Sequence, residues 1–262
     1  MKKNEKLRLG GMALRNGLLV HGPTHWAAAI RTKDGRIQVA SGRKPDFGSK
    51  LLGRVPGARG MSKLAEAFAI VPIVKRHMPE AGLPMEDAKA LGGMLLAALI
   101  SQSVRRGGDR TLGREAAVSA LGLAPALLVL RGGDIAAYHG VEHKAIAAYE
   151  QDGEAAHAQK EHDRCGSNLV APLLATTTVG NVALRRAGMR GTMADALSAL
   201  GGMAVAMELF AWSERHSETK LASALRRPGY EIQRLVGTRE PTEEQLEVGR
   251  AALEEILRVE SD

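Results

Sequence analysis

Four uncharged apolar runs constrain the fold of this 262-residue chain more than any other feature. They cover residues 90–104, 116–130, 165–184 and 196–207, and after Glu208 the last run continues to Trp212. Apolar runs of 12 to 20 residues favour helices over strands, because strands are usually much shorter. Alanine and glycine are frequent in this chain, which allows helices to pack closely. The sequence therefore predicts a mainly α-helical fold.

Whether these helices cross a membrane is not decided by their length. A membrane-spanning helix needs about 20 mainly apolar residues, and two of the runs have only 15. The 20-residue run also contains polar side chains, which are Ser167, Asn168, Thr176, Thr177, Thr178 and Asn181. The loop charges do not alternate clearly, so they give no orientation. Two interpretations stay open: a soluble or membrane-surface helical core, and thin, tilted spans.

The first 60 residues have a different pattern, which predicts a small β meander. Asp34-Gly35 is a strong hairpin signal between the apolar run Trp26–Arg31 and the segment Arg36–Val39. Residues 41–60 are rich in glycine, proline and basic residues, as is typical of a linker or loop.

Helical patterns begin again near residue 61 and reappear close to the C-terminus. Ser62 is a candidate cap for a helix that ends near His77, and its predicted buried face contains Leu64, Ala67, Phe68, Val71 and Val74. Thr242 and Gln245 fit a capping box at the start of an amphipathic helix over residues 242–258. We expect an N-terminal β-rich segment (1–60), a helical core (61–215), and a C-terminal linker and helix (216–262).

Charge and composition limit the classes of partner. The net charge of +7 fits an anionic partner such as nucleic acid, acidic lipid or an anionic substrate. Only 3% of the residues are aromatic, so the chain lacks the stacking platforms of single-strand and RNA readers, and no nucleic acid partner is expected. Its single cysteine, Cys165, excludes an internal disulfide. No apolar signal peptide follows the N-terminal lysines.

The densest group of reactive side chains lies on the predicted helix that Asp134 begins. His139 and His143 are one turn apart on one face of this helix, and Glu142 lies beside them. The order H-x-x-E-H matches the inverzincin motif, in which two histidines bind zinc and the glutamate activates water. The motif therefore predicts a site for Zn²⁺ or another divalent metal, with Glu142 as the catalytic base.

Two histidines need further ligands, because a catalytic zinc site has three protein ligands and a structural site has four. His162 and Cys165, spaced as H-x-x-C, are the best candidates, and His157 is a weaker one. Glu150 lies about 10 Å along the helix axis from His143. We therefore expect it to support the site rather than to bind the ion, and we place Tyr138 and Tyr149 with it.

Each of these residues also has an ordinary structural interpretation. A histidine pair on a helix is often hydrogen bonded, and a lone cysteine at the start of an apolar helix usually packs. The proximity of the two motifs favours metal binding. The hydroxyls of Ser167 and Thr176–Thr178 are expected to bond to the preceding helical turn. The remaining histidines, His21, His25, His77 and His216, are taken as structural.

Several segments together resemble the YqhQ-like family, a bacterial domain of unknown function. The hallmark segments are Tyr138–Lys144, Tyr149-Glu150 and His162–Ser167, with further likeness at Gly10–Ala13, Gly17, Gly22-Pro23, Arg59-Gly60, Pro228-Gly229, Gln233, Thr238, Glu240-Pro241, Glu247-Val248 and Ala251–Leu253. The resemblance implies a metal-dependent enzyme with several transmembrane helices around the motif. The chain departs from the family pattern at Met12, Asn16 and Asp163, where Gln, Glu and Pro are usual.

The leading hypothesis is a membrane-associated metal-dependent hydrolase that uses a zinc-bound water on an unknown substrate. Its motif segment, Arg131–Arg164, is too polar for lipid, so the site is expected on the cytoplasmic side of the bacterial cell membrane. The alternative is a non-catalytic membrane scaffold or assembly factor with a closed, structural His/Cys site. Membrane lipid is the expected partner, a homo-oligomer is possible, and a cytoplasmic location is the alternative.

Overall fold

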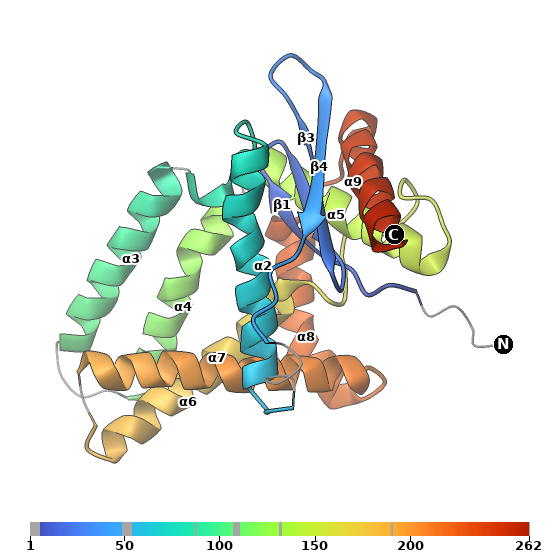
Figure 1. Cartoon of the computed structure of the whole chain (residues 1–262). Coiled ribbons are helices and arrows are strands. Elements are labelled where there is room, and N and C mark those ends of the chain that lie inside the picture. The colour runs from blue at the N-terminus through green and yellow to red at the C-terminus, as the bar shows by residue number, and fades with distance from the viewer. Residues whose placement is uncertain are drawn as a thin grey trace.

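The computed structural model describes residues 6–48, 54–86, 88–106, 111–130, 133–189 and 191–261. Within these residues the chain is mainly helical, with a small N-terminal sheet, as the sequence predicts. Figure 1 shows two regions. The sheet lies with α5 (Gly133–Gln151) and α9 (Glu243–Ser261), while α3 (Ala88–Arg106) and α4 (Leu112–Leu130) extend away from it.

The sheet is an antiparallel meander of β1 (Gly10–Leu14), β2 (Gly17–His21), β3 (His25–Arg31) and β4 (Ile37–Arg43), in sequence order. The hairpin predicted at Asp34-Gly35 is confirmed: Arg31 pairs with Ile37, and Gly35 has φ 84°. Alternate residues of each strand point to opposite faces. One face buries Leu18, Val20, Ala27 and Ala29 with side chains of α5 and α9. The other buries Leu19, Trp26, Ala28 and Ile30 with side chains of α2 (Ala58–His77).

The sequence identified α2 but not its cap, and of the predicted buried face only Val74 is fully buried. The helix begins at Ala58, so Ser62 lies inside it, and the buried residues are Ser62, Glu66, Ile70 and Val74. Phe68, placed by the pattern in the buried face, is 54% exposed. The buried Glu66 carboxylate lies 3.7 Å from Lys44 and accepts the Phe47 N–H. These polar partners come from the segment after β4, so apolar periodicity could not predict this face.

The four uncharged runs are confirmed as helices and form one helical arm. They correspond to α3, α4, α6 (Val170–Arg186) and α7 (Thr192–Arg215). Within the arm α3 packs on α4, α4 on α6, and α6 on α7. Residues 165–169, expected to belong to the third helix, instead contain the 3-10 turn η2 (Gly166–Leu169).

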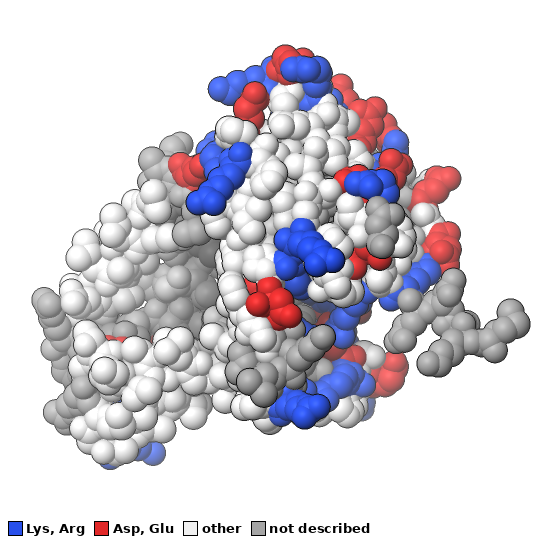
Figure 2. Space-filling view, in the orientation of Figure 1, with Lys and Arg blue, Asp and Glu red and all other residues white. Residues whose placement is uncertain are grey.

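The arm has an apolar outer surface. Exposed apolar side chains on it are Leu91, Met94, Leu95, Leu96, Leu99, Ile100, Leu112, Val179, Met193, Leu197, Leu200 and Val205. Among the described residues visible in Figure 2, few are charged on this side, whereas charged side chains gather on the part with the sheet and α9. Among the described residues, α7 is the one helix long and apolar enough to cross a membrane, and only 22% of its apolar window is buried. Such a helix is a weak indication of membrane association.

The C-terminal elements connect the arm to the sheet. After α8 (Lys220–Ile232) a π-helical turn, η3 (Gln233–Gly237), leads to α9. The predicted capping box is confirmed, because the Thr242 N–H donates to Gln245 Oε1 (3.0 Å) and the Gln245 N–H donates to Thr242 Oγ1 (3.3 Å). The expected division at residues 60 and 215 stays a prediction. The sheet and α9 pack on each other across both of these boundaries.

Candidate metal centre

Helix α5 carries the H-x-x-E-H motif and is buried along most of its length. Every residue from Ile135 to Ala148 is buried, because β1, β2 and α9 pack against it. Two glycines permit close approach: a Cβ on Gly140 would meet the Arg239 carbonyl oxygen, and one on Gly249 would meet Val141. The motif is therefore held inside the molecule rather than on its surface.

The structure brings three of the predicted ligands together. Each of His139, His143 and Cys165 offers one ligand atom, and these three atoms lie within 4.8 Å of one another. All three residues are buried. The two imidazole centroids are 4.3 Å apart. Cys165 Sγ is 3.3 Å from His139 Nε2. Cys165 reaches them because the loop after α5 returns it to the helix, directly before η2.

Backbone carbonyls fix the tautomer of both histidines. His139 Nδ1 donates to the Gly237 carbonyl (2.7 Å), and His143 Nδ1 donates to the Lys160 carbonyl (2.6 Å). A carbonyl oxygen can only accept, so both protons are on Nδ1 and both Nε2 atoms keep a free lone pair. His139 Nε2 accepts from the Cys165 thiol, while His143 Nε2 is buried, makes no hydrogen bond of standard geometry to a described residue, and still interacts with Cys165. Burial lowers the pKa of His143, which favours its neutral ring, and the neighbouring Cys165 opposes this shift.

This arrangement fits a divalent metal ion. Metal-binding histidines commonly donate their second ring N–H to a backbone carbonyl, as both do here. Two imidazole nitrogens and a thiolate are donors that zinc prefers, and three protein ligands leave a fourth position open. The cluster of His139, His143 and Cys165 could therefore hold a metal ion.

Glu142 faces the same region from α5 but is not part of the three-residue cluster. Its carboxylate packs on the backbone of β1, where a Cβ on Gly11 would lie 2.7 Å from Glu142 Cγ. It makes no hydrogen bond to any residue that the structure describes. Burial raises the pKa of Glu142, and the nearby His139 and His162 oppose this. A carboxyl group with a raised pKa can exchange protons near neutral pH.

His162 lies beside the cluster but turns to other partners. Its ring centroid is 5.7 Å from that of His143. Nε2 donates to Glu150 (3.3 Å), while Nδ1 accepts the Arg164 N–H (3.2 Å). Although burial raises the pKa of Glu150, hydrogen bonds from His162 and Arg164 hold it below its usual range. Glu150 thus supports His162, not the cluster directly.

The other predicted residues lie away from the cluster. Tyr138 is buried in the core with sheet and α9 side chains, and its phenol interacts with Arg31. The Tyr149 hydroxyl accepts the Leu7 N–H at 2.9 Å, which fixes the N-terminal segment. His157 is exposed and lies 3.4 Å from Glu154. The Thr176 and Thr177 hydroxyls donate to carbonyls of the preceding turn, as predicted. The prediction is wrong for Ser167, which donates to the Gly229 carbonyl, and for Thr178, which donates to Ser119.

Two residues that shape the site, Gln233 and Gly11, were not predicted as site residues. Gln233, completely buried, accepts the His162 N–H (2.7 Å) and donates to its carbonyl (3.2 Å) and to Ser167 (2.8 Å). Gly11 makes room for Glu142. Both lie in segments that resemble family motifs, and that likeness was the one signal in the sequence that could have indicated them.

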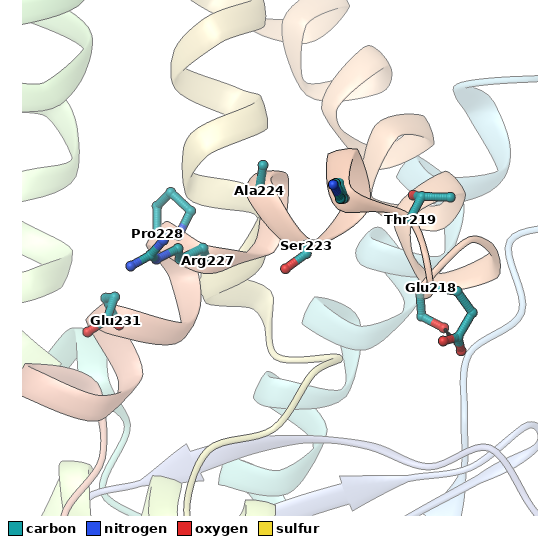
Figure 3. Close-up of a pocket in the computed structure, with 9 residues that line it drawn as sticks. Glu218, Thr219, Ser223, Ala224, Arg227, Pro228 and Glu231 are labelled. Carbon is teal, nitrogen blue, oxygen red and sulfur yellow. Dashed lines mark hydrogen bonds between the residues drawn. The ribbon is translucent and has the colours of Figure 1, made fainter.

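Two surface hollows lie near the loop after α5 and along α8. One, of about 790 Å³, has Glu150, His162 and Arg164 in its wall, together with Arg226 and Tyr230. His162 is the member of its wall that lies beside the cluster, while His139, His143 and Cys165 do not line it. The other, of about 780 Å³, follows α8, and Figure 3 shows Ser223, Arg227 and Glu231 along it. None of the predicted site residues lines this second hollow.

Comparison with known proteins gives a family match but no function. Residues 131–259 match a family model described as "Protein of unknown function (DUF1385)". No curated protein and no solved structure matches the chain. The matched region contains all three members of the cluster, Glu142 and the loop that returns Cys165 to α5. Residues 131–259 are therefore similar to a family of unknown function, which is consistent with the domain of unknown function that the motifs resemble.

Proposed function

We propose that this protein is a membrane-associated metal-dependent hydrolase whose ion, zinc, is held by His139, His143 and Cys165. The observation that carries the proposal is the convergence of three buried donors whose histidine tautomers are already set for metal binding. A zinc ion bound in this way would supply an activated water near neutral pH.

The protein's own groups fit a hydrolytic site. Glu142 is a buried carboxyl group whose raised pKa suits it to accept a proton from water and return it to a leaving group. The Gly237 and Lys160 carbonyls hold the two imidazoles in a fixed orientation. We further propose that a polar substrate approaches from the hollow beside His162, although His139, His143 and Cys165 do not line that hollow.

A closed, structural metal site has less support. It would need a fourth protein ligand, and His162 was the predicted candidate for this position. Both ring nitrogens of His162 are instead engaged, by Glu150 and by the Arg164 N–H. Three donors, with no fourth among the residues that the structure describes, favour an open, catalytic site over a structural one.

The membrane part of the proposal is supported by the arm. The apolar side chains on its outer surface form a face of a kind that water-soluble proteins seldom expose. The bilayer is the expected environment for this face, with the metal site in the polar part of the molecule. The cytoplasmic side stays a prediction, which accessibility labelling of His157 or Lys33 replaced by cysteine would test.

Metal analysis of the purified protein tests the site. We expect about one equivalent of zinc in the wild type, and a loss of most of it in His143→Ala or Cys165→Ser. His157→Ala is the matched control, because this histidine is exposed, and it should keep the ion. No metal in the wild type after purification without chelators and addition of zinc would overturn the proposal.

Replacement of Glu142 separates catalysis from metal binding. Glu142→Gln keeps the shape of the side chain but removes the base, so it should retain the metal and lose function. Complementation of cells that lack the protein measures that function without a known substrate. Full complementation by Glu142→Gln, with normal metal content, would remove the catalytic role and leave a structural site.

A further inference from the structure

The helical arm contains a hollow that is independent of the metal centre. Its volume is about 270 Å³, and its wall comes from α4, α6 and α7. This volume corresponds to roughly nine water molecules at about 30 Å³ each. The lining residues are Ser119, Leu123, Leu173, Leu174, Thr177, Asn181, Asp195, Ala199 and Met203. None of them belongs to the metal centre or to the family's hallmark segments.

The order of the lining residues along the helices makes the hollow amphipathic. One end has Leu123, Leu173, Leu174 and Met203. Helices α6 and α7 are connected by a short turn and pack side by side. Residues close to that turn, Asn181 and Asp195, therefore lie together at the other end. A ligand of this hollow would have an apolar chain and a polar terminus.

The polar end contains a side chain with unused hydrogen-bonding groups. Asn181 is 5% exposed and lines the hollow, yet its amide makes no hydrogen bond to any residue that the structure describes. A buried amide without partners costs free energy unless a ligand or water satisfies it. Its oxygen accepts and its nitrogen donates, so it matches a terminus that does both.

Charges near this end are already paired. Asp195 accepts from Arg185 at 2.7 Å, and Arg185 also lies 3.9 Å from the buried Glu115. A charged terminus would bring an unpaired charge into a poorly solvated site, which is unfavourable. An uncharged hydroxyl or amide terminus avoids this cost.

The outer faces of the same helices are apolar, with Leu112, Val179, Leu197 and Leu200 exposed. A ligand that partitions into a hydrophobic phase would therefore be concentrated next to the hollow. We propose that this hollow binds a single-chain lipid with an uncharged hydroxyl or amide terminus, which Asn181 recognises.

Photo-crosslinking of the full chain tests this binding. The protein is mixed with phosphatidylcholine vesicles and a ten-carbon alcohol that carries a photoactivatable group, and labelled peptides are mapped by mass spectrometry. We expect the label on the lining segments of α4, α6 and α7. Decanol should compete with the probe, and decanoate, which has the same chain but a negative charge, should compete more weakly.

Two variants and one control make the result decisive. Asn181→Leu keeps the side-chain volume and should weaken competition by decanol about fivefold, the usual effect of one lost hydrogen bond. Ala199→Trp fills the hollow from an exposed position and should abolish specific labelling. Ala196→Trp adds the same bulk at an exposed position of α7 outside the hollow and should label normally.

Three outcomes would overturn the proposal. These are uniform labelling of the apolar surface, labelling that both Asn181→Leu and Ala199→Trp leave unchanged, and equal competition by decanol and decanoate. Zinc content is measured on the same samples. It should be unchanged in every variant, so that a failure of the lipid site and a failure of the metal site are distinguishable.

Discussion

At the scale of single residues, the geometry of the candidate metal centre depends on the groups that contact its side chains from the far side. His139 and His143 are close in sequence, but the carbonyls that orient them belong to Gly237 and Lys160, on two different segments. Glu142 is positioned in another way, by a glycine on β1 that leaves space for its carboxyl group. The two histidines are therefore local in sequence, whereas their orientation is a product of the tertiary fold.

Gly11→Ala tests the space behind Glu142. The added Cβ would lie 2.7 Å from Glu142 Cγ, so the carboxyl group or β1 must move. We expect a loss of about 1 to 3 kcal/mol in the free energy of unfolding, as for other overpacked sites, and reduced complementation. Chemical denaturation measures the first effect. Gly201→Ala on α7 has open space around it and should be neutral or slightly stabilising.

At the scale of elements, short contacts between distant segments hold the site together. The π-helical turn η3 supplies Gln233, whose amide bonds both backbone groups of His162 and so fixes the loop that carries Cys165. Helix α9 is tied to the sheet at its C-terminal end, because Ser41 donates to Glu255, and Thr24 and the His25 N–H donate to Glu260.

Gln233→Leu tests the link between η3 and the metal loop. The partly buried backbone groups of His162 would lose their partners, which should cost about 1 kcal/mol of stability or more. Because the loop carries Cys165, zinc affinity should fall by about tenfold or more. Competition with a chromogenic chelator measures this affinity. Arg234→Ala, at a neighbouring half-exposed position, should leave it unchanged, and equal affinities in both variants would contradict the link.

Glu255 makes the docking of α9 dependent on pH. Hydrogen bonds from Arg258 and Ser41 lower the pKa of Glu255 to about 2 from an ordinary value of 4.5. The group therefore adds stability above pH 4.5, and this contribution disappears as the pH falls from 4.5 to about 2.

Glu255→Gln should therefore destabilise the protein at pH 7 by about 1 kcal/mol, and the difference from wild type should vanish near pH 2. Denaturation curves across this range measure the effect. Glu254→Gln makes the same charge change at an exposed position of α9, and it should have little effect at any pH. A difference between Glu255→Gln and wild type that does not depend on pH would contradict this assignment.

At the scale of the whole molecule, the chain divides into a charged region with the metal centre and a helical arm with an apolar surface, visible in Figures 1 and 2. Helix α5 follows α4 in sequence, and α6 follows the loop that carries Cys165. The metal centre is thus built where the arm joins the rest of the chain. Under the proposed function, catalysis would take place at a membrane surface.

Membrane association should depend on the apolar face of the arm. Leu95, Leu96 and Leu99 on α3 are 67%, 59% and 61% exposed, and each contributes about 1.5 kcal/mol or more when buried in an apolar phase. Their joint replacement by glutamine should shift the protein from membrane pellets towards the soluble fraction. Carbonate-washed fractions, analysed by immunoblotting, measure this shift.

The control is the joint replacement of Leu221 and Leu235 by glutamine. These two leucines are similarly exposed (61% and 68%) but lie on α8 and η3, outside the arm. This replacement should not change the distribution. If neither variant moves the protein, or if the wild type is already soluble, the arm does not hold it at a membrane.

The sequence by itself determined the local features. Uncharged runs predicted the helices of the arm, Asp34-Gly35 predicted a hairpin, and Thr242 with Gln245 predicted a helix cap. The spacing of His139 and His143 placed them on one face, because helix geometry fixes residues four apart. All of these depend on neighbours within a few positions along the chain.

Only the tertiary structure decided which distant groups meet. It joined Cys165 to the histidine pair, turned His162 towards Glu150, and buried Glu66 rather than Phe68. Spacing treats His162 and Cys165 as equal candidates, since both lie on the same returning loop. Their roles differ because Gln233 from η3 binds both backbone groups of His162, and Glu150 from α5 accepts from the His162 ring. Such contacts between distant segments leave no periodic pattern in the sequence.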